Sequence, residues 1–325
     1  MKTKFILLLF FFPKFLFAQD LEKNDKIIYL DAAFVVTDEA NHVYYRIVKD
    51  YNLTKSEYSI IQYFKSGKKE GEGISTLRDF PKQKGVYIRY YENENKKSST
   101  NYDNDGNKSG DCTFWYANGE IEFEAEFIKS ISKIDGFERP ISTLKINNFW
   151  NTAKVQTTID GNGDFTDNGY FDNFDDNSIS NGKLINGYKD GVWSGNNSKL
   201  GITFTEDYKN GKLISGKSID SNKLEYSYDK ISVNAEGKDG IMGFYKYVGK
   251  KMVVPENIGK GKIVTQFTIS VTGEISNLKV IRGLRDDADR EAIRVISNYK
   301  DFIPAKLRGI NIKSNYTFPI TIQGS

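Results

Sequence analysis

The sequence predicts a mainly β protein, in which a β-meander of hairpin repeats precedes a small α+β domain built as strand, strand, helix, strand. Three observations lead to this fold class. Pairs of aromatic residues recur every 25–27 positions between residues 63 and 116, residues 261–283 alternate apolar and polar side chains, and residues 286–299 carry apolar side chains at helical spacing. The length of 325 residues suits about two domains.

The first residues have the layout of a secretory signal peptide over residues 1–18. Two lysines precede an apolar run over residues 5–12, and the small Ala18 stands before a polar residue. An uncleaved membrane anchor is the alternative, but the run is shorter than the ~20 residues that a span needs. We therefore expect export to the periplasm, with association to a membrane left open. The single Cys112 cannot form an intrachain disulfide, so packing must hold the fold.

Behind this leader we expect a meander over residues 19–222, a linker over 223–243 and a C-terminal domain over 244–325. The charge distribution favours a division into domains. From Phe244 onward the chain has 14 basic and 7 acidic residues. In the whole chain without the lysines of the leader, the numbers of basic and acidic residues are equal. The C-terminal part is therefore basic, and the preceding part is acidic.

The repeats of the meander are predicted hairpins. The pairs Tyr63-Phe64, Tyr90-Tyr91 and Trp115-Tyr116 each precede residues rich in Gly, Asn and Lys, which tolerate the backbone of tight turns. Degenerate versions follow at residues 187–195 and 207–216. One hairpin cannot bury its apolar face alone, so neighbouring hairpins must pack together.

These units resemble the MORN-like repeats of bacterial antitoxin-like β-meander proteins, well over residues 60–130 and loosely over 185–216. The resemblance implies a scaffold or an interaction surface. It implies no catalysis.

An acidic segment between the clearer units invites a metal hypothesis. Asp160, Asn162 and Asp164 alternate as at the start of a calcium loop, but Phe165 and Phe171 stand where such a loop needs Gly and Glu. We therefore predict acidic turns and no metal site.

The C-terminal segment from Gly261 shows a clean β-hairpin. Apolar residues share one face of the first strand, Gly273 supplies a turn, and alternation resumes in the second strand. The apolar positions are Ile263, Phe267, Ile269 and Val271, then Leu278 and Val280.

A helix should follow, with Asp286 as its N-cap and one apolar stripe on its surface. The stripe consists of Ala288, Ala292, Val295, Ile296 and Tyr299. After Pro304 a last strand alternates over residues 316–322, and Pro319 indicates that this strand lies at an edge of the sheet or ends there.

Residues 244–322 resemble the C-terminal domain of TonB, the energy transducer of Gram-negative envelopes. The positions that carry this resemblance are Pro255, Gly261, Thr272-Gly273, the segment "LKVIRG", Asp289, Ala292, Pro304-Ala305, Gly309 and Pro319-Ile320. The resemblance implies a module that adds a peptide of an outer-membrane receptor, or of another envelope protein, as a strand at the edge of its sheet. By position, residues 312–322 would be this edge, with Tyr316, Thr317, Phe318 and Ile320 as the partner-binding residues.

The chain departs from a force-delivering transducer, which needs a membrane anchor and a long stiff spacer: cleavage of the leader would remove the anchor, and residues 1–18 contain no histidine of the kind that the resemblance would place there. It has 6 prolines and no Pro-rich spacer between the leader and the C-terminal domain. From the resemblance we still expect an association with TonB-dependent transport across the outer membrane, by docking of receptor peptides. The alternative is a periplasmic structural adaptor whose repeats bind the main partner.

Chemistry of other kinds finds little support in the sequence. His42 is the only histidine, so no histidine pair can hold a metal, and no nucleophile motif accompanies it. We expect no catalytic residues, no cofactor, no small-molecule substrate and no nucleic-acid partner. The oligomeric state is not predicted.

Overall fold

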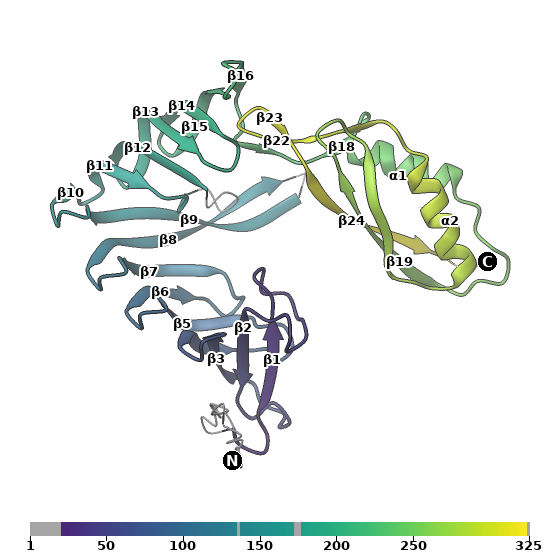
Figure 1. The fold of residues 1–325 in the computed structure, drawn as a ribbon, viewed down its shortest axis with the longest axis horizontal. Coiled ribbons are helices and arrows are strands. Elements are labelled where there is room, and N and C mark those ends of the chain that lie inside the picture. Colours follow the sequence, from purple (N-terminus) through teal and green to yellow (C-terminus); the bar gives the residue numbers. More distant parts are fainter. Residues whose placement is uncertain (1–20, 135–136, 172–176, 324–325) are drawn as a thin grey trace, which may run out of the picture. The chain divides into compact units, whose positions relative to one another are not determined.

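The computed structural model describes residues 21–134, 137–171 and 177–323, and the predicted signal peptide over residues 1–18 lies outside them. The protein is mainly β, with a meander sheet of 16 antiparallel strands followed by a small α+β region (Figure 1). The chain forms two compact units, one ending at Gly161 and one beginning at Asn162. No helix in the described ranges combines the length and the apolar character that spanning a bilayer requires.

The first unit is a run of hairpins in which each strand pairs with the next. Its strands are β1 (Lys26–Leu30), β2 (Tyr44–Val48), β3 (Tyr58–Phe64), β4 (Lys69–Ser75), β5 (Gln83–Tyr90), β6 (Lys96–Tyr102), β7 (Lys108–Trp115), β8 (Ile121–Ile134), β9 (Phe137–Trp150) and β10 (Gln156–Ile159). One face of this sheet, which we call the buried face, carries Ile60, Tyr87, Thr100, Cys112, Phe123, Ala125 and Ile146.

The predicted hairpin repeats are confirmed by the turns of this unit. The N–H groups of Phe64, Tyr91 and Tyr116 donate to carbonyls four residues later at 2.8–2.9 Å, so each aromatic pair ends a strand and opens its turn. The Tyr91 hydroxyl also donates to the Trp115 carbonyl at 2.8 Å, and the Tyr116 hydroxyl donates to the Trp150 carbonyl at 2.8 Å. Successive turns are thereby tied together, and the neighbouring hairpins lie side by side in one sheet.

Trp150 belongs to a fourth aromatic pair, Phe149-Trp150, which the spacing argument missed. Strands β8 and β9 have 14 residues each, whereas β3 to β7 have 7 or 8. The longer strands place this pair beyond the expected interval.

The second unit continues the meander. Its first strands are β11 (Asn162–Asp167), β12 (Ser178–Ile185), β13 (Tyr188–Asn197), β14 (Ile202–Lys209), β15 (Lys212–Ile219) and β16 (Glu225–Tyr228). Trp193 is fully buried and packs against Gly182 of the neighbouring strand. A Cβ atom at Gly182 would come within 2.4 Å of the indole. Glycine here leaves room for the aromatic ring.

The acidic segment that begins at Asp160 forms turns and strands. Asp160 and Gly161 have φ values of 47° and 77°, as in a two-residue hairpin turn, and β11 follows directly. Within the described ranges, no group of three His, Cys, Asp or Glu side chains is arranged to hold a metal ion.

The C-terminal α+β region follows the meander within the second unit. Its elements are β17 (Ser232–Val233), β18 (Glu236–Gly237), α1 (Gly240–Lys251), β19 (Gly261–Ile269), β20 (Ile275–Arg282), α2 (Asp286–Ser297), β21 (Phe302–Ile303), β22 (Ala305–Leu307), β23 (Ile310–Ile312) and β24 (Ser314–Ile322). The three long strands form a sheet in the order β20-β19-β24, and α1 and α2 share one hydrophobic core with it (Figure 1).

The predicted hairpin, helix and last strand are all present as β19, β20, α2 and β24. The stripe of α2 is buried as expected, and Gly273 takes a φ of 88° in the turn. Two details were wrong. Val271 is 49% exposed because the first strand ends at Ile269, and the N-cap of α2 is Arg285, so that Asp286 is the first helical residue. Helix α1 is absent from the predicted order.

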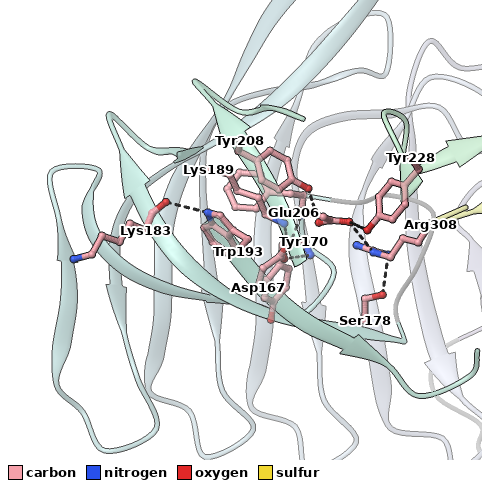
Figure 2. A network of polar contacts seen from close by, with 11 residues as sticks. Asp167, Tyr170, Ser178, Lys183, Lys189, Trp193, Glu206, Tyr208, Tyr228 and Arg308 are labelled. Carbon is pink, nitrogen blue, oxygen red and sulfur yellow. Dashed lines mark hydrogen bonds and ion pairs between the residues drawn. The ribbon is translucent and has the colours of Figure 1, made fainter. Parts of the chain in front are cut away.

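A buried ion pair joins the C-terminal region to the meander of the second unit (Figure 2). Arg308 and Glu206 have side chains that are 0% exposed, and Arg308 Nε donates to Glu206 Oε1 at 2.9 Å. Arg308 sits with Gly309 in the turn between β22 and β23, where the φ values of these two residues are 49° and 81°. The side chain of Arg308 extends from this tight turn to Glu206 of β14.

The surroundings satisfy both charges. Arg308 Nη1 donates to Ser178 Oγ at 3.0 Å, and its guanidinium lies 4.0 Å from the centre of the Phe204 ring. The carboxylate of Glu206 accepts hydrogen bonds from the hydroxyls of Tyr208 at 2.8 Å and Tyr228 at 2.7 Å. Burial and the nearby Glu206 carboxylate raise the pKa of Tyr228, so this hydroxyl stays a donor.

A second buried ion pair lies in the same part of the meander (Figure 2). Lys189 Nζ is 2.7 Å from Asp167 Oδ2, and both side chains are almost fully buried. The rings of Trp193 and Tyr208 lie 4.6 and 5.2 Å from the ammonium group, which gains cation–π attraction. This part of the core is therefore polar in its centre and aromatic around it.

Replacing Gly182 tests the packing of Trp193. We expect Gly182→Ala to lower the free energy of unfolding by about 1–3 kcal/mol, because the added methyl group overlaps a ring that cannot move away. Urea unfolding measures the change. Gly259→Ala is the matched control, since no heavy atom lies within 4 Å of a Cβ atom there. Equal effects of the two changes would contradict the packing argument.

Replacing Arg308 tests the joint between the meander and the C-terminal region. We expect Arg308→Met to destabilise the second unit by about 3–5 kcal/mol, because Glu206 would remain charged and buried. Hydrogen exchange of β14, measured by mass spectrometry in increasing urea, reports this loss.

Two further variants sharpen this experiment. Arg294 pairs with Glu291 at the surface, so Arg294→Met should have a much smaller effect. The double variant Arg308→Met/Glu206→Gln should recover part of the lost stability, since Glu206 no longer leaves an unpaired charge in the core. No recovery in the double variant would show that packing, and not charge, explains the loss.

Candidate partner-binding edge

Strand β24 forms one edge of the three-stranded sheet. It pairs with β19 along its whole length, from Ile322 opposite Gly261 to Ser314 opposite Ile269. Among the described residues no strand pairs with its other side. The edge position indicated by Pro319 is thus confirmed, and the strand continues past the proline to Ile322.

The backbone of β24 presents its free groups at alternate residues. The Thr265 hydroxyl donates to the Phe318 carbonyl at 3.2 Å, so this carbonyl points toward β19. In an antiparallel ladder the next residues on either side point the opposite way. The N–H groups of Asn315, Thr317 and Thr321 therefore face the open edge. The nitrogen of Pro319 also faces the open edge, so the missing N–H removes no hydrogen bond between β24 and β19.

The four residues predicted to bind a partner lie in this strand but not on one surface. Phe318 and Ile320 are 1% and 8% exposed and belong to the core, whereas the side chain of Thr317 is exposed. Tyr316 is half-buried, with its ring 5.3 Å from that of Phe267, and burial raises its pKa to about 12. Three of the four residues thus face the helices, and one faces solvent.

Helix α1 lies beside β24 and forms a groove with it. The rings of Phe244 and Tyr245 pack 4.6 and 4.7 Å from the Phe318 ring. The groove has a volume of about 630 Å³ and lies along the second half of β24. It is lined mainly by apolar residues, among them Val248, Met252, Val254, Phe318, Ile320 and Ile322.

Gly249 keeps this groove open. It lies in α1 and lines the groove, and no heavy atom lies within 4 Å of the position that a Cβ atom would take. A larger residue there would occupy the space beside the open edge.

Helix α1 was not predicted from the sequence. Its residues 240–243 fall in the expected linker over residues 223–243, and its groove residues fall in the expected C-terminal domain, which was predicted to begin without a helix. A helical signal exists, because Ile241, Phe244, Tyr245 and Val248 follow the spacing i, i+3, i+4, i+7. Two glycines inside the helix, Gly243 and Gly249, weaken this signal.

The other chemically distinctive residues lie apart from this edge. His42 lies in a loop of the first unit, with its ring 5.0 Å from that of Tyr29. Cys112 is buried in the same unit, and burial raises the pKa of its thiol to about 12. Its sulfur is therefore protonated at neutral pH.

The comparisons with known proteins bear on the C-terminal region. A family model described as the C-terminal domain of the Gram-negative bacterial TonB protein matches residues 257–321. No curated protein and no solved structure gives a significant match to this chain. The matched residues include β19, β20 and α2 and all but the last residue of β24. The C-terminal region is thus similar to the C-terminal domain of the TonB protein of Gram-negative bacteria, and we call it the TonB-like domain.

Proposed function

We propose that this chain is a periplasmic protein whose TonB-like domain binds an extended peptide of an outer-membrane receptor by adding it as a strand to β24. The observation that carries the proposal is the open edge of β24 beside an apolar groove. The main-chain groups of Asn315, Thr317 and Thr321 would bind the backbone of the peptide, and the groove would take its apolar side chains.

The proposal assigns the predicted residues two different roles. Thr317 offers its backbone to the incoming strand. Phe318 and Ile320 line the groove, so their side chains would contact those of the partner, and Tyr316 holds the start of the strand against Phe267. The added strand would not displace any of the core contacts described above.

Docking, and not delivery of force, is the function that we propose. With 6 prolines in 325 residues the chain lacks a Pro-rich spacer. An association with TonB-dependent transport follows from the proposed partner. The resemblance of the hairpin units to MORN-like repeats stays a prediction, as does the adaptor role in which those repeats bind the main partner.

Proline at position 317 tests strand addition. We expect Thr317→Pro to abolish capture of outer-membrane receptors by the immobilised full chain, because it removes an N–H that faces the open edge but none that bonds to β19. Thr317→Val is the control, since it keeps the N–H group. Undiminished capture by the proline variant would move binding to another surface, such as the repeats.

Filling the groove is an independent test of the same site. Gly249→Leu should weaken receptor capture without lowering the midpoint of urea unfolding, because the new side chain enters open space. The control is Gly259→Leu, which also places a side chain in open space but away from the residues that line the groove. If both variants captured equal amounts of receptor, the groove would not take part in partner binding.

The proposed location has its own test. If the leader is cleaved, mass spectrometry of the chain from a periplasmic fraction should give a mature N-terminus at Gln19. A chain that retains its first residues and sediments with the inner membrane would contradict cleavage.

A further inference from the structure

A row of polar side chains crosses the buried face of the first unit, far along the chain from the TonB-like domain. Arg46 of β2 pairs in register with Gln62 of β3, Gln62 pairs with Gly71 of β4, and Gly71 pairs with Arg89 of β5. Directly paired residues of neighbouring strands lie on the same face of a sheet. Two arginines therefore approach each other across one glutamine and one glycine.

Hydrogen bonds connect this row through a single carboxylate. Arg46 Nη2 donates to Gln62 Oε1 at 2.8 Å, and Gln62 Nε2 donates to Glu70 Oε2 at 2.8 Å. Arg89 donates from both Nε and Nη2 to Glu70 Oε1. Glu70 is only 3% exposed, whereas the side chain of Arg89 is 38% exposed. The carboxylate is thus enclosed, and the arginine beside it is open to solvent.

The row holds more positive charge than Glu70 neutralises. Arg46 has no ion pair with any described residue, and its Nε atom is buried without a hydrogen-bond acceptor. Burial lowers the pKa of Arg46, although the nearby Tyr87 and Glu70 oppose this shift. An unpaired donor of this kind has a clear cost in a folded protein.

Two lysines on the next strands add to this excess. Lys97 of β6 and Lys108 of β7 form no ion pair with a described residue, and the ammonium of Lys108 lies 4.9 Å from the Phe127 ring centre. Burial, together with the charge of Arg89, lowers the pKa of Lys108. Burial and, after it, the charge of the buried Glu122 carboxylate raise the pKa values of Tyr91 and Tyr116.

Tyr87 contributes a hydroxyl in the middle of this row. Its ring lies over β4, and its Oη atom is 2.6 Å from the position that a Cβ atom would take at Gly71. Gly71 lies between Gln62 and Arg89, so the hydroxyl is placed between these two side chains. It donates no hydrogen bond to another described residue, and neither does the hydroxyl of Tyr102, which pairs with Lys108.

A purely structural network would need one cation for Glu70, and Arg89 already supplies it. The charge of Arg89 acts unfavourably on Lys97 and Lys108, and no carboxylate forms an ion pair with Arg46, Lys97 or Lys108 among the described residues. Guanidinium forks, ammonium groups and phenol hydroxyls are together the donors that bind phosphate oxygens.

We propose that Arg46, Arg89, Lys97 and Lys108, with Tyr87, form a binding site for a phosphate-bearing anion on the buried face of the first unit. The phosphate belongs either to a soluble phosphorylated compound or to the headgroup of an anionic lipid. This site is independent of the edge of β24, so the first unit contributes ligand binding of its own.

The test uses the full chain and two probes. Isothermal titration calorimetry with inorganic pyrophosphate measures binding of a soluble phosphate. Co-sedimentation with phosphatidylcholine vesicles that contain phosphatidic acid measures binding of a headgroup, and vesicles of phosphatidylcholine alone are the reference. We expect saturable binding of at least one probe, and binding of the vesicles alone would identify a headgroup as the source.

Lys97→Gln is the decisive variant, because Lys97 is exposed and forms no ion pair with a described residue, so we expect the variant to fold. We expect it to weaken binding at least about tenfold, the effect of losing one charge-assisted hydrogen bond. Lys84→Gln is the matched control, since Lys84 lies on β5 but pairs with Glu57. Tyr87→Phe removes only the hydroxyl and should also weaken binding.

Two results would overturn this proposal. One is the absence of binding to both probes. The other is equal weakening of binding by Lys97→Gln and Lys84→Gln, which would indicate unspecific attraction to a basic surface.

Discussion

The buried ion pair between Arg308 and Glu206 is the constraint on which the arrangement of the second unit depends. Neither charge could remain in this core without the other. The turn that carries Arg308 lies between β22 and β23, and only Lys313 separates β23 from β24. The ion pair therefore fixes the place where the candidate binding strand begins, and the edge of β24 is anchored to the meander of the same unit.

Local patterns predicted much of the fold. The alternation over residues 261–283, the stripe of α2 and the aromatic pairs at the turns were sufficient, because each reflects contacts within one hairpin or one helix. Helix α1 and the pair Phe149-Trp150 were missed. The glycines of α1 lower its helix propensity, and the long strands β8 and β9 lengthen the interval between aromatic pairs. The Arg308–Glu206 contact spans 102 positions, and no local pattern encodes it.

The candidate site shows the same division. Position in the chain placed the edge at β24, and Pro319 gave a physical reason for it. The sequence could not show that Phe318 and Ile320 are core residues, or that Gly249 opens a groove beside them, because these facts depend on how α1 packs against the sheet. The cluster around Arg89 depends likewise on the register of four neighbouring strands.

Pro319 also restricts which strands can join β24. A second copy of this chain that paired with β24 in antiparallel fashion would bring its own proline to the same edge, and two residues without an N–H group would weaken one ladder. A foreign strand without proline loses only one donor. Pro319 thus disfavours the pairing of two copies at this edge more than it disfavours the pairing of β24 with a strand that has no proline.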